Sequence, residues 1–268
     1  MPSQPDIPEL RQAAEEAARL GGRLAAELLS QPRQVASKGF RDLVTDADFA
    51  SQAAIISYLR QRYPGHGFVA EESAAGLPRA GDVLWLIDPV DGTTNYSREI
   101  PLYSVSVAAY SANGDGGTGL AGAIYDPSRD ELFSAGAGRG ASLNGRPIRV
   151  SRTAELAAAI PGVDWSHAPA LRERFIATLN GFAHKVHTTR AIGSAALALA
   201  WVAVGRLDAY INFSLAPWDV AAGQLLVHEA GGRLTDVDDT PWRLEGGGCV
   251  ASNGRLHDAF MQAAGLIA

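Results

Sequence analysis

The stretch WLIDPVDGTTNY, residues Trp85 to Tyr96, runs from an apolar segment directly into two aspartates, a glycine and two threonines. The apolar run Val83 to Ile87 has the length and composition of a buried strand, so we expect the strand to end there and Asp88 to follow it out of the core. Gly92 leaves room for a close approach, and the threonines after it suit the start of a helix. The stretch therefore predicts a core strand followed by an acidic loop.

The composition is that of a globular protein with a sizeable core. The chain has 268 residues, of which 47% are hydrophobic, enough for one large domain or two subdomains in close contact. Its formal net charge is -6, and its Lys and Arg residues form no cluster. Because nucleic-acid surfaces need clustered positive charge, we expect no nucleic-acid partner.

Cysteine content and the absence of targeting patterns indicate where the protein resides. The one cysteine, Cys249, excludes an intramolecular disulfide and favours a reducing compartment. No basic segment followed by an apolar run stands near the N-terminus, so no secretory signal is visible. The longest uncharged stretch, residues 191–205, is shorter than the roughly 20 residues that span a bilayer, so it predicts a helix buried in protein. We expect a cytoplasmic protein with no membrane partner.

Alternating helix and strand patterns continue on both sides of the opening stretch. Apolar residues from Leu10 to Leu28 follow the spacing of an amphipathic helix, which Pro32 ends, and a second helix is expected from Phe49 to Arg62. Residues Tyr103 to Val150 read as short strands joined by turns, which predicts a mainly antiparallel sheet.

The pattern after about Ser151 mixes helices and strands again. We therefore expect an α/β protein of the α+β kind, with one subdomain at residues 1–150 and a second at residues 151–268.

Acidic residues stand at the ends of several expected elements, where the loops of an α/β layer carry functional sites. Taken one at a time, each could be an exposed turn residue, a helix cap or an acid on a helix dipole. They occur in the segments DLVTDAD (Asp42, Asp46, Asp48), EES (Glu71, Glu72), DPVDGTTNY (Asp88, Asp91) and WDVAAG (Asp219).

In this order, these four segments resemble the signature segments of the inositol monophosphatase family of magnesium-dependent phosphatases. The resemblance continues through AGAIYDPSRDELFSAGAGRGASLNGRPI, IGSAAL and GGGCVASNG, so it covers nearly the whole chain. One departure is Ala70, where the family usually has glycine before its two glutamates. The resemblance implies a layered α-β-α-β-α sandwich of two α/β subdomains.

The resemblance also implies a set of metal ligands. Glu71, Asp88 and the backbone carbonyl of Val90 would hold a first Mg²⁺, and Asp88 would bridge to a second ion held by Asp91 and Asp219, with two or three ions in all. Gathering carboxylates within about 5 Å costs on the order of 3 kcal/mol per pair at an effective dielectric of 20, so a cation must offset the repulsion. Oxygen ligands without His or Cys favour Mg²⁺.

Catalytic and substrate-binding roles follow from the same resemblance. Asp48 and Thr93, acting with the metal held by Glu71, would orient the attacking water. The backbone N–H groups at the start of the helix after Gly92 would cradle the phosphate. The implied substrate-binding residues are Asp91, Gly92, Thr93, Gly193, Ser194, Ala195, Asn212 and Asp219.

Asn212 stands where several members of the family carry a glutamate that accepts hydrogen bonds from inositol hydroxyls. An asparagine offers one acceptor oxygen and two donor hydrogens but no charge. From the residues alone, a substrate contact and a cap at a strand end both remain open. Glu72, Asp42 and Asp46 are expected to be solvated, capping or supporting groups rather than ligands, and Lys38 could lie near the metals or be exposed.

The function that the resemblance implies is Mg²⁺-dependent hydrolysis of inositol 1-phosphate and similar small phosphate monoesters. Related phosphatases that act on 3′-phosphoadenosine phosphate, NADP, fructose 1,6-bisphosphate or histidinol phosphate are the alternative within the same reaction class. A regulatory binding protein on the same scaffold is the non-enzymatic alternative. The resemblance further suggests inhibition by Li⁺ and a homodimer.

Overall fold

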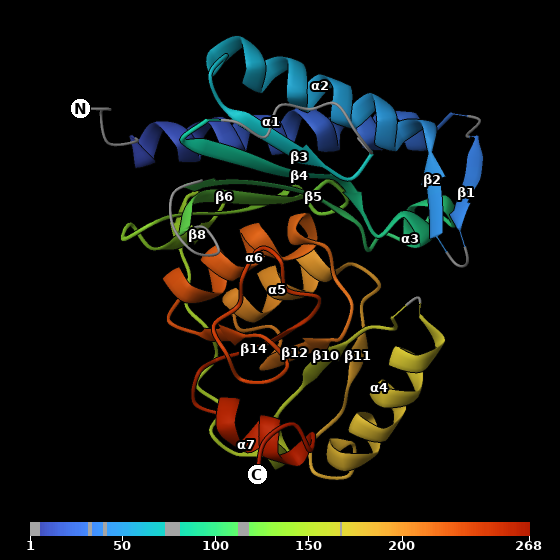
Figure 1. Ribbon diagram of the computed structural model, residues 1–268, viewed down its shortest axis with the longest axis vertical. Helices are drawn as coiled ribbons and strands as arrows, with labels where there is room; N and C mark the ends of the chain where they lie inside the picture. Colours follow the sequence, from blue (N-terminus) through green and yellow to red (C-terminus); the bar gives the residue numbers. More distant parts are fainter. Residues whose placement is uncertain (1–5, 32–33, 40–41, 73–80, 112–117, 167) are drawn as a thin grey trace.

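The computed structural model describes residues 6–31, 34–39, 42–72, 81–111, 118–166 and 168–268, which form alternating layers of helix and sheet (Figure 1). Helices α1 (Ile7–Leu29) and α2 (Asp46–Arg62) cover one face of a large sheet. Helices α5 (Ala195–Ala203) and α6 (Pro217–Glu229) separate this sheet from a smaller one, and α4 (Pro169–Phe182) and α7 (His257–Ala263) form the last layer. The layering confirms the expected α-β-α-β-α sandwich.

The large sheet has seven strands in the order β3-β4-β5-β6-β7-β8-β9. Strands β3 and β4 are parallel, and every following pair is antiparallel, which confirms the antiparallel sheet expected after Tyr103. The strands are β3 (Gly67–Ala70), β4 (Val83–Asp91), β5 (Ser104–Ser111), β6 (Thr118–Asp126), β7 (Glu131–Gly136), β8 (Ala141–Leu143) and β9 (Arg146–Pro147).

The smaller sheet has five strands in the order β11-β10-β12-β14-β13. Strand β10 is parallel to both of its neighbours, and β14 is antiparallel to both of its own. The strands are β10 (Pro161–Val163), β11 (Arg190–Ala191), β12 (Ala209–Asn212), β13 (Arg233–Thr235) and β14 (Cys249–Ser252). Helices α5 and α6 come after residue 150 yet pack on the first sheet (Figure 1), so the division into residues 1–150 and 151–268 remains a prediction.

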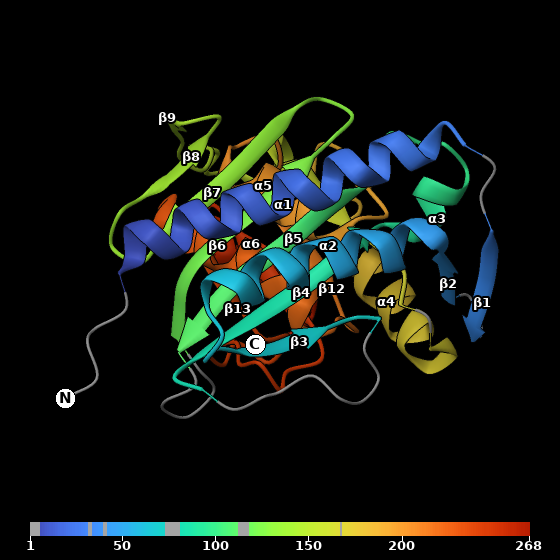
Figure 2. The same ribbon diagram turned by 90° about the horizontal axis from the view of Figure 1, so that it is seen from above.

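Helix α1 has the amphipathic pattern that the sequence shows, and it lies across the large sheet beside α2 (Figure 2). Asp6 caps its first turn by accepting a hydrogen bond of 3.2 Å from the backbone N–H of Glu9. Gly21 lets the two helices approach, because a Cβ at this position would lie 2.6 Å from the side chain of Ile55. The predicted helix is thus confirmed, and its contact with α2 at Gly21 leaves no room for a side chain.

Helix α2 begins three residues before the predicted start at Phe49. Its first turn is closed by Asp48, whose Oδ2 accepts a hydrogen bond of 2.8 Å from the backbone N–H of Thr45 and another from the Thr45 hydroxyl. An acid at the third helical position can cap the helix in this way, and it also favours the positive end of the helix dipole. Asp48 therefore has a structural role in addition to any role in the site.

Strand β4 corrects the expectation that the strand ends at Ile87, because it continues through Asp91. Its residues are buried on both faces apart from Leu84, as expected for a central strand beneath helices on either side. The short helix α3 (Thr93–Ser97) follows, as the two threonines suggested.

Three short elements remain in the described part of the chain. They are β1 (Val35–Gly39), β2 (Asp42–Thr45) and the 3₁₀ helix η1 (Leu156–Ala158). The stretch 191–205 contains α5, and eight of its nine residues are buried, which confirms the expected buried helix. Among the described residues, no helix is long and apolar enough to cross a bilayer.

Candidate functional site

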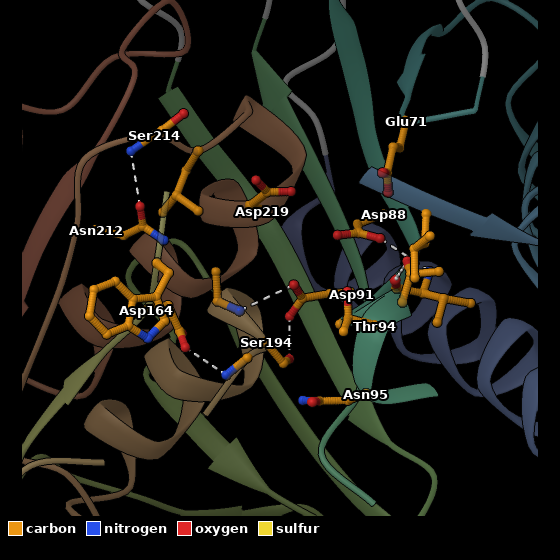
Figure 3. A pocket seen from close by; sticks show the side chains of 18 of the residues that line it. Glu71, Asp88, Asp91, Thr94, Asn95, Asp164, Ser194, Asn212, Ser214 and Asp219 are labelled. Carbon is orange, nitrogen blue, oxygen red and sulfur yellow. Dashed lines mark hydrogen bonds between the residues drawn. The ribbon is translucent and has the colours of Figure 1, made fainter. Parts of the chain in front are cut away.

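A pocket of about 580 Å³ lies between β4, α3, the loop before α5 and the loop before α6. Figure 3 shows Glu71 and Asp88 on one side of it, Asp164 and Asn212 on the other, and Asp91 and Asp219 between them. The structure therefore brings most of the predicted site residues together. Those that line the pocket are Glu71, Asp88, Val90, Asp91, Gly92, Thr93, Gly193, Ser194, Ala195, Asn212 and Asp219.

An irregularity in β4 turns two aspartates towards this pocket. Asp88 pairs with Ser106 of β5 and Asp91 pairs with Ser104, so the pairing register shifts between the two aspartates. Residues three apart on a regular strand point to opposite faces, but one extra residue returns them to the same face. The side chain of Asp88 also bonds to the displaced backbone, since its Oδ1 accepts a hydrogen bond of 3.1 Å from the N–H of Val90. The bulge is thus what allows one strand to present both acids to one cavity.

Asp91 is held in place by the first turn of α5. Its carboxylate accepts hydrogen bonds from the backbone N–H groups of Ala195 (3.1 Å) and Ala196 (2.8 Å) and from the hydroxyl of Ser194. The hydroxyl of Ser104 adds a fourth at 3.3 Å. Negative charge is favoured at a helix N-terminus, so these donors stabilise the buried carboxylate. Ser194 and Ala195 therefore orient Asp91 directly.

The acids in the pocket repel one another. Loss of hydration on burial, followed by the negative charges of Glu71, Asp91 and Asp219, raises the pKa of Asp88 well above its usual range. Burial and the charge of Asp91 likewise raise the pKa of Asp219. Carboxylates that are buried and also repel one another are costly to charge without a cation.

The donor set fits a hard divalent cation. It consists of carboxylate oxygens and the carbonyl oxygen of Val90, without histidine or cysteine, and oxygen ligands of this kind suit Mg²⁺. Within the described ranges, no three acidic, histidine or cysteine side chains form a ready-made ion cage. Mg²⁺ does not require one, because it commonly binds through one or two carboxylates and takes its other ligands from water and phosphate.

Thr93 and Asp48 lie in contact beside the acids. The Thr93 hydroxyl lies 3.2 Å from Oδ1 of Asp48 and 3.1 Å from the carbonyl oxygen of Val90, either of which can accept its hydrogen. Asp48 is fully buried and does not line the pocket, so it can reach the site only through Thr93. Burial raises the pKa of Asp48, although its hydrogen bonds to Thr45 oppose the rise.

Two glycines make the close approach of the loops possible. Gly92 has φ of +95°, and a Cβ there would lie 2.9 Å from the carbonyl oxygen of Gly193. Gly193 has φ of +75°, and a Cβ there would lie 2.7 Å from Nδ2 of Asn95. That amide donates to the carbonyl oxygens of Leu102 (2.7 Å) and Ile192 (2.9 Å), so it ties the turn after α3 to the loop before α5. Asn95 was not among the residues predicted from the sequence.

Asp164 is a further pocket residue that was not predicted from the sequence. Its Oδ1 accepts a hydrogen bond of 2.6 Å from the N–H of Gly193, and its Oδ2 accepts one of 3.1 Å from the hydroxyl of Tyr210. Burial is the main reason that its pKa rises to about 7. One signal could have identified it, because Asp164 directly follows the short apolar strand β10, in the same way that acids follow the apolar part of β4.

Asn212 forms part of the pocket wall and is only 4% exposed. Its Oδ1 accepts a hydrogen bond of 2.9 Å from the N–H of Ser214, and its Nδ2 lies 3.4 Å from the hydroxyl of Tyr210. Asn212 thus supports the wall and also lines the cavity, which is consistent with both of the roles left open by the sequence. Its direct contact with substrate stays a prediction.

Two other acids named from the sequence, Asp46 and Glu72, are not among the residues that line the pocket. Asp46 is exposed in the first turn of α2, and Glu72 is partly buried, with its backbone N–H donating to Oε1 of Gln52 at 2.9 Å. The side chains of Lys38 and Asp42 lie outside the described residues, so their expected roles stay predictions.

The sequence and the fold are similar to those of known proteins. The model of the inositol monophosphatase family matches residues 6–266. The chain is 39% identical to the Nus factor SuhB of Salmonella typhimurium over 251 residues, which cover 91% of each chain. It is 35% identical to inositol monophosphatase 3 of Solanum lycopersicum, over 96% of this chain and 97% of that one.

A solved structure shares the fold over the same length. The inositol monophosphatase of Anabaena (Nostoc) sp. PCC 7120 superposes with a TM-score of 0.85 and 36% identity, covering 98% of both chains. The matched span includes β4 with its two aspartates, the loop before α5 and the start of α6. The chain belongs to the inositol monophosphatase family.

Proposed function

We propose that this protein is a Mg²⁺-dependent phosphomonoesterase that hydrolyses small phosphate monoesters, inositol 1-phosphate among them. The observation that carries the proposal is the bulge of β4, which presents Asp88 and Asp91 to the pocket that Glu71 and Asp219 also line. Four carboxylates around one cavity repel one another unless a cation is bound, and a bound cation would attract a phosphate group.

The residues of this chain divide the work of such a reaction. Glu71, Asp88, Asp91, Asp219 and the Val90 carbonyl would hold two or three Mg²⁺ ions, which would neutralise the phosphate charge and make a water molecule more nucleophilic. The Thr93 hydroxyl would orient that water, and Asp48 would accept the hydrogen bond that Thr93 donates. The backbone at Gly92 and Thr93 would contact the phosphate, and the wall formed by Gly193, Ser194, Ala195 and Asn212 would face the alcohol portion.

A phosphate-release assay with a substrate panel tests this proposal. Chelation should abolish activity and added Mg²⁺ should restore it, and Asp219→Asn should lower kcat by about a hundred-fold or more. Asp46→Asn, an exposed acid outside the pocket lining, is the matched control and should retain full activity. Full activity in EDTA or in Asp219→Asn would overturn the proposal.

The panel should also rank the substrates. It should contain inositol 1-phosphate, 3′-phosphoadenosine phosphate, NADP, fructose 1,6-bisphosphate and histidinol phosphate. We expect inositol 1-phosphate to be hydrolysed together with several other small monoesters. If one of the others has a kcat/KM about a hundred-fold higher than inositol 1-phosphate, the phosphatase class stands and the inositol assignment is wrong.

A second candidate function is that of a Nus factor, which is the role in the name of the relative Nus factor SuhB. It is supported by the 39% identity between the two proteins over 91% of both chains. This role corresponds to the regulatory alternative rather than to catalysis. Expression of the wild type and of Asp88→Asn in Escherichia coli lacking its own Nus factor SuhB separates the regulatory role from catalysis. Rescue by both proteins would assign this role independently of the acids, and rescue by neither would argue against it.

A further inference from the structure

The wall across the pocket from Glu71 carries an aromatic side chain for which the proposed chemistry has no use. Trp165 follows Asp164 at the end of β10 and lines the pocket, and it is 43% exposed. Other large hydrophobic side chains that are exposed in the described part of the chain, such as Phe49, Ile100 and Ile176, do not line it. Scattered exposed hydrophobic residues are normal on a protein surface, but this indole faces the cavity of the candidate site.

The indole of Trp165 is held in one orientation by α4. Phe175, itself buried, meets it edge to face, with the ring centroids 5.1 Å apart and an angle of 83° between the planes. The guanidinium carbon of Arg172 lies 5.5 Å from the centroid of an indole ring, which is a cation–π distance. Arg172 is fixed in turn, because its Nε donates a hydrogen bond of 2.6 Å to the carbonyl oxygen of Ser166. A rigid aromatic surface binds a ligand with little loss of side-chain entropy.

The chemistry of this wall differs from that of the metal end. Glu71, Asp88, Asp91 and Asp219 gather at one end and in the middle of the cavity, and Asp164 lies on the other side (Figure 3). Trp165 follows Asp164 in the chain, and the guanidinium group of Arg172 lies over its indole. Arg172 is the one lysine or arginine among the described residues that line the pocket. A phosphate at the metal end would leave the alcohol portion of the substrate pointing towards this wall. A volume of about 580 Å³ is in the range of pockets that enclose drug-sized ligands.

We propose that Trp165 is a stacking platform for a planar aromatic group in the alcohol portion of the substrate, such as the base of a nucleoside monophosphate. This inference rests on the proposed phosphatase function and narrows its substrate class. In the hydrolysis, the water oxygen forms a bond to phosphorus, the bond from phosphorus to the nucleoside oxygen breaks, and that oxygen takes up a proton. Trp165 touches only the departing nucleoside, so it acts on affinity and specificity rather than on bond cleavage.

The test compares adenosine 2′-monophosphate with glycerol 2-phosphate, two esters of secondary alcohols that differ in the nucleoside. Trp165→Ala should lower kcat/KM for adenosine 2′-monophosphate by about ten-fold or more, mainly through KM, because base stacking on an aromatic side chain is worth this much. The value for glycerol 2-phosphate should stay within about two-fold, and Trp165→Phe should preserve most of the preference. Ile176→Ala, an exposed residue of α4 outside the pocket lining, is the matched control and should change neither substrate.

Each other outcome decides against the platform. Equal losses for both substrates in Trp165→Ala would assign the indole to the structure of the wall, and no loss for either would show that it contacts no substrate. A preference for bisphosphates that disappears in Arg172→Gln would assign the wall to a second anionic group instead.

A binding measurement separates this inference from the proposed function. If the wild type hydrolyses neither ester with Mg²⁺, the phosphatase proposal fails, and calorimetric titration with adenosine 2′-monophosphate then tests the platform alone. Binding that weakens about ten-fold in Trp165→Ala would support the platform. Absent binding, or binding that is unchanged in the variant, would overturn it.

Discussion

Asp88 and Asp91 lie three residues apart on β4, yet their partners Ser106 and Ser104 lie only two apart on β5, so both aspartates face the same side of the sheet. The serines confirm the direction, because the Ser104 hydroxyl donates to Asp91 and the Ser106 hydroxyl donates to the carbonyl oxygen of Trp218 near the start of α6. The extra residue thus converts an ordinary central strand into a support for two neighbouring acids.

The first prediction concerns the repulsion among these acids. Burial, followed by the negative charges of the neighbouring acids, raises the pKa of Asp88, so this carboxyl lowers the stability of the folded, ion-free protein at neutral pH. Asp88→Asn should therefore raise the melting temperature in EDTA, by about 2–4 °C for each kcal/mol gained, while abolishing most activity. Mg²⁺ should stabilise the wild type more than the variant. Thermal unfolding with and without Mg²⁺ measures both effects, and a lower melting temperature of Asp88→Asn in EDTA would contradict the repulsion.

The second prediction separates chemistry from ion binding at Thr93. Its hydroxyl contacts Asp48 and the Val90 carbonyl but carries no charge, so Thr93→Ala should lower kcat by about ten- to a hundred-fold and shift the Mg²⁺ midpoint little. Thr93→Ser keeps the hydroxyl and should restore most of the rate. A large shift in the midpoint with an unchanged rate would instead assign Thr93 to the structure of the ion site.

The third prediction concerns Asp164 as a positioning residue. It accepts a hydrogen bond from the backbone N–H of Gly193. This glycine directly precedes the first turn of α5, whose N–H groups hold Asp91. Asp164→Ala should loosen this turn and weaken the apparent Mg²⁺ affinity by about ten-fold, as is usual when a group that orients a ligand is removed. Asp164→Asn keeps an acceptor oxygen and should preserve the affinity. Magnesium titrations of activity compare the variants, and equal losses in both would show that the charge rather than the hydrogen bond matters.

The fourth prediction concerns Asn212. Its amide donates a hydrogen bond to the hydroxyl of Tyr210, and this hydroxyl in turn donates one to Asp164. Asn212→Glu should improve selectivity for inositol 1-phosphate by up to about ten-fold, because a charged acceptor strengthens hydrogen bonds from hydroxyl groups. The new carboxylate would lie near that of Asp164, so we expect a larger gain in the double variant Asn212→Glu with Asp164→Asn. Ratios of kcat/KM for inositol 1-phosphate and glycerol 2-phosphate decide this, and an unchanged ratio in both variants would contradict a substrate contact at position 212.

The fifth prediction concerns stability at acid pH. Burial, and then the positive charge of Arg233, lowers the pKa of His257 from 6.5 to about 4. Below about pH 6.5 the unfolded chain therefore binds a proton at His257, whereas the folded chain binds it only below about pH 4. The contribution of neutral His257 to stability is thus fully present above pH 6.5 and is lost as the pH falls from 6.5 to 4. Between pH 7.5 and pH 5, the free energy of unfolding should fall by on the order of 2 kcal/mol through this group. Urea unfolding at pH 7.5 and pH 5 measures it.

A neutral replacement provides the control for this titration. His257→Gln removes the ionisable ring, whose nitrogens lie within 3.1 Å of the hydroxyls of Thr235 and Ser252. The variant should be less stable at every pH, but its stability should vary less between pH 7.5 and pH 5. The same pH dependence in both proteins would assign the effect to other groups.

The fold could be predicted from the sequence wherever local periodicity decides the structure. The spacing of apolar residues gave α1, and the turn-rich stretch after Tyr103 gave the antiparallel strands. The same reasoning ended β4 too early, at Ile87, because polar residues inside a strand contradict its propensity. A bulge and the helices packed around it override that propensity, and neither is visible in a single stretch of sequence.

The candidate site was predictable where acids stand in recognisable segments, since the acids expected as ligands line one pocket. Asn95, Asp164 and Trp165 were not predicted, for two different reasons. Asn95 and Asp164 act through backbone atoms of the loop before α5, and such contacts leave no pattern in the sequence, so the one signal for Asp164 is its place directly after the apolar strand β10. Trp165 has its place in the pocket only because β10 lies beside β12 and α4 covers that sheet.

The donors that hold Asp91 have a consequence for the newly made chain. Ser194, Ala195 and Ala196 are translated more than a hundred residues after Asp91. At 5–20 residues per second, a nascent chain carries this aspartate for roughly 5–20 s before its partners leave the ribosome. During that interval β4 can pair with β5, but the acids at its end remain hydrated and open to solvent. The pocket is therefore one of the last parts of the protein that can form during synthesis, well after the sheet that supports it.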